Sequence, residues 1–269
     1  MSTTGVTPAG LADLETLLVD VSEGIALVTV NRPDVLNALN GAVISDLTTV
    51  LEALRDDDSV GAVVFTGAGA KAFVAGADIS EVREFGIDVG LSGHMQRALD
   101  TLEGFPKPTI AAVNGFALGG GCELAMACDI RIASSKARFG LPETNLAVLP
   151  GAGGTQRMSR LIGVGRTIEL ILTSRMVPAA QAEQYGLVTE VVEPEALLDR
   201  AREVATTILA KGPLAVRLAK LVVRSGFDAA QPTGQVIELL AQSLLYTTQD
   251  KAEGTAAFLA KRPAEFRGH

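Results

Sequence analysis

Apolar and polar residues follow one another in patterns that predict alternating strands and helices over the first two thirds of the chain. Two β-rich apolar runs, 17–21 and 25–30, flank Ser-Glu-Gly and precede Arg32-Pro33, which predicts a hairpin. Apolar residues recur at helical spacing from Val43 to Leu54. The alternation continues to about Val192 and indicates an α/β layer structure. The other predicted elements are strands over 61–66, 109–113 and 130–133, helices that begin after Asp78 and run from Met95 to Leu102, a small-residue turn over 115–121 and a short helix over 122–128.

The pattern changes beyond Glu193, where helical periodicity replaces the alternation. We therefore place a boundary near residue 195, between an α/β core over residues 1–195 and a helical region over residues 196–269. The predicted helices of the second region cover 194–211, 213–224, 233–246 and 249–261.

Composition and charge exclude several classes of protein. With 48% hydrophobic and 20% charged residues, the chain can bury a large core and is not a disordered polymer. No apolar run is long enough to cross a bilayer, and a net charge of −8 argues against nucleic-acid partners. No basic residue precedes Arg32, so no secretion signal or transit peptide is indicated. We expect a soluble cytoplasmic protein in which Cys122 and Cys128 are small buried residues in a reducing compartment.

The familiar catalytic and nucleotide-binding motifs are absent from the sequence. The histidines, His94 and His269, form no H-E-x-x-H pair, so a zinc hydrolase is not indicated. No G-x-S-x-G, G-K-[ST] or G-x-G-x-x-G occurs, which disfavours a nucleophile elbow, a phosphate loop and a nicotinamide-dependent oxidoreductase.

The glycine-rich segment 114–123 is the most informative stretch of the chain. A predicted strand ends there in glycines and a helix begins. The first turn of a helix carries unpaired N–H groups and a partial positive charge, so a phosphate cradle or an oxyanion hole can form. Close packing of the helix on the strand explains the glycines equally well.

Two acids follow apolar or glycine-rich segments and are candidates for proton transfer. Glu123 stands in the first predicted helical turn and is otherwise explained as a helix-capping charge. Glu143 follows Phe139-Gly140-Leu141-Pro142, and a solvent-facing loop acid is the alternative. A second glycine turn, 150–154, leads to a helix with Thr155 as a plausible cap. Two acids beside glycine-rich helix starts fit an acid–base pair better than a nucleotide site, since desolvation raises a carboxyl pKa toward neutrality.

The segment 73–79 contributes a third candidate feature. Small residues end at Asp78, a predicted helix cap with Glu81 three residues on. The backbone N–H of Ala77 can face a ligand there, although a simple tight turn also fits the pattern.

Together these segments resemble the crotonase superfamily, and most closely its enoyl-CoA hydratases. The resemblance spans about Leu17 to Arg267 with the motifs in the same order. It implies a spiral of ββα units, a C-terminal helical region that oligomerises into trimers or paired trimers, and an acyl-CoA thioester substrate bound by the core. The matching motifs are N-R-P…N-A-L-N (31–40), F-V-A-G-A-D-I (73–79), A-V-N-G-F-A-L-G-G-G-C-E-L-A-M-A-C-D (112–129), F-G-L-P-E (139–143), P-G-A-G-G-T-Q-R (150–157) and E-G-T-A-A-F-L-A-K-R (253–262).

The resemblance also implies roles for individual residues. Ala77 and Gly120 would supply the oxyanion-hole N–H groups, Glu123 would take a proton from water, and Glu143 would give one to C2. Retention of both acids favours syn hydration of a 2-trans-enoyl-CoA to a 3-hydroxyacyl-CoA, in fatty-acid or related acyl-CoA metabolism, without metal or redox cofactor. An enoyl-CoA isomerase and a non-catalytic acyl-CoA or RNA binder remain alternatives.

Two positions of the chain depart from the family pattern. Ser80 stands where several hydratases carry lysine, and Leu141 stands where some carry glutamine. Phe258 and Lys261 match positions that contact coenzyme A from a neighbouring subunit. The complete implied set is Ala38, Ala75, Gly76, Asp78, Ile79, Ser80, Gly151, Phe258 and Lys261.

Overall fold

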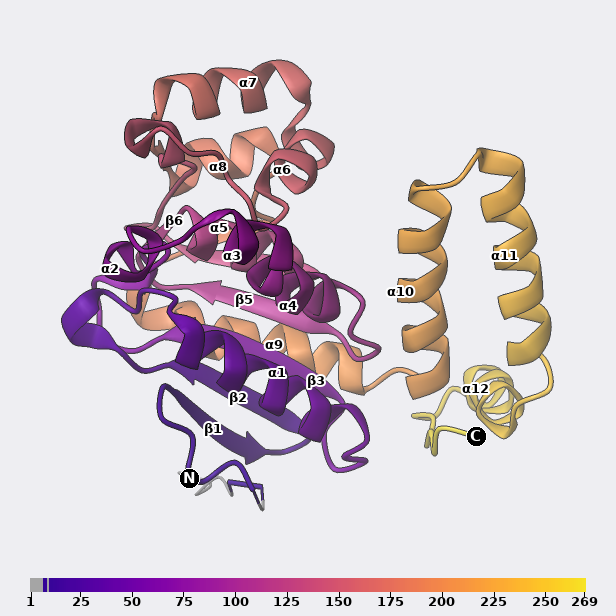
Figure 1. Ribbon diagram of the computed structural model, residues 1–269. Coiled ribbons are helices and arrows are strands. Elements are labelled where there is room, and N and C mark those ends of the chain that lie inside the picture. The colour runs from indigo at the N-terminus through magenta and orange to yellow at the C-terminus, as the bar shows by residue number, and fades with distance from the viewer. Residues whose placement is uncertain (1–6, 9) are drawn as a thin grey trace.

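The computed structural model describes residues 7–8 and 10–269 (Figure 1). The expectation that the chain begins without a targeting signal therefore falls partly outside the described residues. None of the described helices is long and apolar enough to cross a membrane.

A six-stranded sheet forms the centre of the α/β part. Its first two strands make the predicted antiparallel hairpin, with Leu17 opposite Val30 and Ser22 opposite Ile25. All the other neighbours in this sheet are parallel. In spatial order the strands are β1 (Leu17–Ser22), β2 (Ile25–Val30), β3 (Ala62–Gly67), β5 (Thr109–Val113), β7 (Ile130–Ser134) and β10 (Glu190–Val192).

A second sheet of four short strands lies beside the first. The three strands β4, β6 and β8 run parallel as neighbours, and β9 is antiparallel to β8. Strands of two or three residues carry too little periodicity to be recognised from sequence. The turn predicted over 115–121 was therefore wrong at 116–118, where β6 pairs with both neighbours. The strands are β4 (Ala72–Val74), β6 (Phe116–Leu118), β8 (Arg138–Gly140) and β9 (Val177–Pro178).

The chain visits the two sheets in a repeated order, which gives the expected spiral of ββα units. A strand of the large sheet is followed by a strand of the small one and then by helical structure, as in β5–β6–α5. The helical segments of this part are η1 (Pro33–Val35), α1 (Gly41–Arg55), α2 (Ile79–Val82), α3 (Ile87–Ser92), α4 (His94–Glu103), α5 (Gly120–Ala127), η2 (Glu143–Leu146), α6 (Gly154–Ile162), α7 (Val164–Thr173) and α8 (Ala179–Tyr185).

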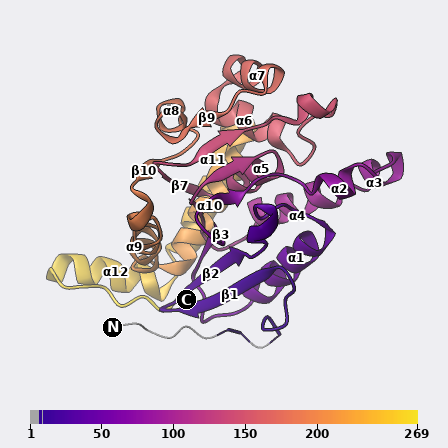
Figure 2. The same ribbon diagram turned by 90° about the vertical axis from the view of Figure 1, so that its left-hand side faces the viewer.

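Buried apolar side chains line both faces of the large sheet, and helices α1 and α9 lie on opposite sides of it (Figure 2). One face packs on the buried stripe of α1, including Leu47, Leu51 and Leu54, as the helical spacing predicted. The other face packs on α9 (Leu197–Leu209), following the short helix η3 (Pro194–Ala196). Cys122 and Cys128 are buried free thiols, as expected.

The last three helices form a group beside the α/β body (Figure 1). They are α10 (Pro213–Phe227), α11 (Gln231–Leu245) and α12 (Gln249–Ala260). Helix α9 packs directly on the large sheet, whereas α10 to α12 lie to one side of it. The helices therefore leave the sheet after α9, at about residue 210. The boundary placed near residue 195 stays a prediction.

Candidate active site

Three strands of the small sheet deliver the candidate residues to one edge. Ala77 follows β4, Gly120 follows β6 and Glu143 follows β8. Because these strands are parallel neighbours, their carboxyl ends lie side by side, where ligands commonly bind in α/β proteins. Segments that are distant in the sequence therefore meet at one place.

The glycines between β6 and α5 have separable roles. Gly119 makes the turn with φ 50° and ψ −125°, and α5 begins at Gly120, two residues earlier than predicted. A Cβ built on Gly121 would overlap the carbonyl oxygen of Val74 in β4, so close packing requires this glycine. A Cβ built on Gly120 would lie 3.8 Å from the amide nitrogen of Ala77, so Gly120 faces the 75–78 loop.

The amides of Ala77 and Gly120 are available to a ligand. Leu39 holds the loop by donating to the Gly76 carbonyl (2.8 Å) and accepting from the Asp78 amide (2.7 Å). These bonds leave the Ala77 N–H with no acceptor among the described residues. Gly120 is the first residue of α5, where N–H groups have no intrahelical partner. The two donors can therefore bind one oxygen together.

Glu123 is buried between two helix starts. Its side chain leaves the first turn of α5, and the residue is 2% exposed. Oε1 accepts hydrogen bonds from the amides of Ala152 (2.8 Å) and Gly154 (2.7 Å) at the start of α6. Burial raises the pKa of Glu123, while these amides and the charge of Arg157 oppose the rise. The carboxyl group is fixed by the 150–154 turn.

Glu143 is the first residue of η2 and reaches the glycine turn from the opposite side. Its Oε1 lies 2.9 Å from the position that a Cβ on Gly119 would occupy. Its Oε2 is buried without a hydrogen-bond partner in the described part of the chain. Burial raises the pKa of Glu143 to about 7, and the charge of Glu123 contributes to the rise. The alternative of a solvent-facing loop acid is therefore wrong.

Two expected caps differ in the structure. The N-cap of α6 is Gly153, with φ 96°, and not Thr155, because the 150–154 turn directs its amides to Glu123. Asp78 caps α2 by accepting from the Ser80 amide (3.2 Å), as expected, but Glu81 binds the Gly41 amide (2.9 Å) and no capping box forms.

The structure brings most of the implied substrate-binding residues to this edge and leaves two apart. Ala38, Ala75, Gly76, Asp78, Ile79 and Ser80 lie on the two paired segments 36–39 and 75–80, and Gly151 belongs to the turn that binds Glu123. The Ser80 hydroxyl donates to Asp78 (2.6 Å). Phe258, 83% exposed, and Lys261 belong to α12 and its C-cap, away from α2 in both views (Figures 1 and 2).

Two arginines near the site, Arg32 and Arg157, were not predicted from the sequence. Arg32 binds the Ala38 carbonyl (2.6 Å) and Asp78 (3.1 Å) and so ties the two loop segments together. Arg157 contacts the turn beside Glu123. Both residues belong to motifs shared with the crotonase superfamily, and this membership was the sequence feature that could have identified them. Their carboxylate partners lie about 50 residues away in the chain, so local spacing could not identify them.

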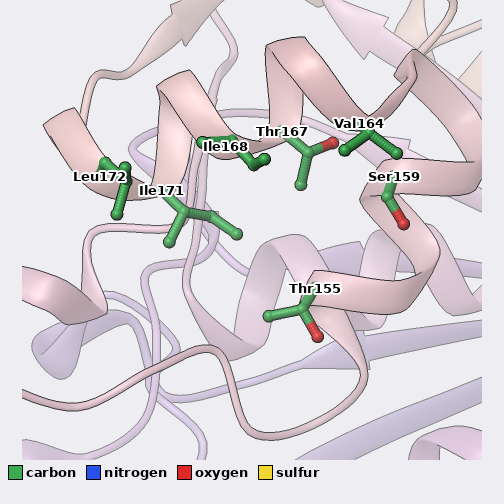
Figure 3. A pocket seen from close by; sticks show the side chains of 7 residues that line it. All are labelled: Thr155, Ser159, Val164, Thr167, Ile168, Ile171 and Leu172. Carbon is green, nitrogen blue, oxygen red and sulfur yellow. The ribbon is translucent and has the colours of Figure 1, made fainter.

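A shallow apolar groove runs between α6 and α7 (Figure 3). Val164, Ile168 and Leu172 line it and are each more than half exposed. Neither Glu123 nor Glu143 lines this groove, so it is distinct from the candidate active site.

Comparison with known proteins agrees with this geometry. The sequence model of the Enoyl-CoA hydratase/isomerase family matches residues 20–269. A short-chain-enoyl-CoA hydratase from Clostridium acetobutylicum is 45% identical over 94% of this chain and 98% of its own. A crotonyl-CoA hydratase from Syntrophomonas wolfei is 45% identical over the same shares. The crystal structure of an enoyl-CoA hydratase from Bacillus anthracis superposes with a TM-score of 0.92 at 41% identity, covering 95% of this chain and all of that one. The chain therefore belongs to the enoyl-CoA hydratase/isomerase family of the crotonase superfamily, as its motifs indicated.

Proposed function

We propose that this enzyme catalyses syn addition of water to the C2=C3 bond of a 2-trans-enoyl-CoA, giving a 3-hydroxyacyl-CoA in fatty-acid or related acyl-CoA metabolism. The observation that carries the proposal is the placement of two acids, buried Glu123 and half-buried Glu143 with its buried Oε2, near the N–H groups of Ala77 and Gly120. The names of the Clostridium and Syntrophomonas relatives support a short acyl chain as the first substrate to test.

The amides would act on the thioester carbonyl. Attack of water at C3 pushes an electron pair from the double bond toward the thioester oxygen, which becomes an enolate oxygen. Donors at Ala77 and Gly120 would bind that oxygen and strengthen their bonds as its charge grows. Removal of one such donor typically costs about 3–4 kcal/mol of transition-state stabilisation.

The acids would divide the proton transfers. Glu123 as a carboxylate would accept a proton from water while the oxygen bonds to C3, and protonated Glu143 would deliver its proton to C2. The exchanged proton then returns from Glu123 to Glu143 through solvent, which closes the cycle. The proximity of the two acids favours this division. The negative charge of Glu123 raises the pKa of Glu143 and so favours its protonated form.

The pH dependence of hydration should report the proton held by Glu143. Its pKa of about 7 means that the required protonated form is lost as the pH rises through neutrality. We expect kcat with crotonyl-CoA, measured by loss of enoyl absorbance, to fall above about pH 7 by about tenfold per pH unit. A kcat that stays constant from pH 6 to 9 would show that Glu143 does not supply the proton.

Isomerisation is the second candidate activity because the family includes isomerases. An isomerase needs one dominant base, whereas this site carries two acids, buried Glu123 and half-buried Glu143. Incubation with a 3-enoyl-CoA separates the candidates, since an isomerase would make the 2-enoyl product and stop. Accumulation of that product, together with no hydration of crotonyl-CoA, would replace hydration by isomerisation.

We further propose that the chain assembles into a homotrimer or a pair of trimers. Large apolar side chains on α10 and α11, including Val223, Leu239 and Leu240, are more than half exposed. Phe258 and Lys261 would then contact coenzyme A across a subunit boundary. Light scattering coupled to size exclusion should give three or six times the monomer mass of 27.9 kDa. A monomer at micromolar concentration would contradict this assembly.

Two further proposals concern the setting of the reaction. Hydration adds the elements of water to the double bond without net oxidation or reduction, so we propose that no metal or redox cofactor takes part, which dialysis against a chelator followed by assay tests. We also propose a cytoplasmic location, supported by the two free buried thiols. Fractionation of the source cells tests it.

A further inference from the structure

Arg157 holds the turn that binds Glu123. Its Nη1 donates to the carbonyl oxygen of Ala152 (2.7 Å), and its side chain is 7% exposed. The same residue, Ala152, donates its amide to Glu123 on the other side. A Cβ on Gly153 would overlap the guanidinium group, so the turn passes over the arginine only because residue 153 is glycine.

Two carboxylates of α4 fix the direction of the guanidinium group. Nε donates to Glu103 (2.8 Å) and Nη2 to Asp100 (2.5 Å). The other oxygen of Glu103 accepts from Arg224 in α10 (2.8 Å), which itself binds Asp129. Asp100 and Glu103, which lie outside the turn, therefore fix the direction of the Arg157 guanidinium group. The guanidinium group in turn fixes the position of the Ala152 carbonyl.

We propose that Arg157 is a positioning residue for Glu123: by holding the Ala152 carbonyl against α4, it keeps the amides of residues 152 and 154 directed at Oε1. The inference rests on the proposed role of Glu123. Among the described residues, the side-chain hydrogen bonds of Arg157 go to Ala152, Asp100 and Glu103, and its side chain is 7% exposed, so it acts on the reaction through the turn and not through the substrate.

Loss of the guanidinium group should affect turnover more than binding. The turn would lose a charge-assisted bond, and the amides of Ala152 and Gly154 would lose their fixed direction. We expect Arg157→Gln to lower kcat by about 10- to 100-fold, a range typical of residues that orient a functional group. The KM for crotonyl-CoA should change less than about threefold, because substrate contacts remain.

The pH profile supplies a readout that a purely structural role would not move. The Arg157 charge and the two amides lower the pKa of Glu123 against the effect of burial. In Arg157→Gln both influences weaken, so the acid limb of the kcat profile, where Glu123 must ionise, should move to higher pH. Arg157→Lys keeps the charge without the fork of donors and should restore part of kcat and of the acid limb.

Besides Arg157→Lys, the experiment compares four variants with the wild type. Arg160→Gln is the matched control, because Arg160 lies on the same helix, is exposed and, within the described part of the chain, its side chain pairs only with exposed Asp228 and Gln156. Glu103→Gln weakens the bond that orients Arg157 from the carboxylate side. It replaces Arg157→Gln as the test if that variant does not fold. It should lower kcat in the same direction by less. Circular dichroism and thermal melts establish the folded fraction of each variant.

The outcomes separate this inference from the proposed function. A folded Arg157→Gln with kcat within twofold of wild type, or with a kcat loss that only follows the folded fraction and an unmoved acid limb, overturns the positioning role. The fourth variant, Glu123→Gln, reports on the proposed function itself. If it is inactive while the Arg157 and Glu103 variants match Arg160→Gln, only the positioning role fails. If it is fully active, the proposed mechanism fails first.

Discussion

Replacing Glu123 with glutamine is expected to lower kcat for hydration of crotonyl-CoA by about 10²- to 10⁴-fold, the usual contribution of a positioned acid or base. Glutamine has nearly the shape of glutamate and keeps an oxygen for the amides of Ala152 and Gly154. It cannot take the proton from water at neutral pH. The variant should therefore stay folded, with a melting temperature close to that of wild type.

Glu143→Gln should cause a loss of similar size because the amide cannot supply a proton to C2. Its buried Oε2 makes no bond that the substitution would break, so this variant should also fold. Glu52→Gln, on the exposed face of α1, is the matched control and should leave kcat unchanged. Both site variants retaining wild-type kcat would eliminate the proposed acid–base pair.

Gly121→Ala should be the most damaging single change to the fold near the site. The added methyl group would overlap the Val74 carbonyl, and neither β4 nor α5 can move freely, since both are buried. Overpacking of this kind costs about 1–3 kcal/mol of unfolding free energy, and more where backbone must shift. Displacement of α5 would also move the Gly120 amide away from Ala77, so kcat should fall in the molecules that fold.

Urea unfolding of Gly121→Ala beside Gly165→Ala measures this effect. Gly165 lies at the start of α7 with no atom within 4 Å of an added Cβ, and alanine favours helix over glycine by up to about 1 kcal/mol. The control should therefore be as stable as wild type or slightly more stable. Equal unfolding midpoints for the two variants would show that α5 does not depend on this close approach to β4.

Sequence periodicity correctly predicted elements that are formed by neighbouring parts of the chain or that carry a regular apolar pattern over many residues. The hairpin β1–β2 and helix α1 are confirmed because alternation and helical spacing extend over many residues. Strand β6 was missed because its three residues become a strand only through pairing with β4 and β8, which lie far away in the chain. Short strands of this kind depend on tertiary contacts more than on their own sequence.

The candidate site divides in the same way. The position of Glu123 in the first turn of a helix follows from the glycines that precede it, and the structure agrees. Its second attachment, at the start of α6, joins residues 29 and 31 positions apart and has no local pattern. The unpaired oxygen of Glu143 likewise results from how η2 packs and not from any motif.

The separate origins of the site's groups have a consequence for how such an enzyme can change. In the proposed mechanism the thioester oxygen is bound by main-chain N–H groups at residues 77 and 120, which every residue except proline provides, so point mutation rarely removes them. The groups proposed to transfer protons are the side chains of Glu123 in α5 and Glu143 in η2, and each can be replaced by a single point mutation. In this mechanism, binding of the enolate oxygen tolerates most point mutations, whereas replacing either carboxyl group changes the proton transfers that decide the product.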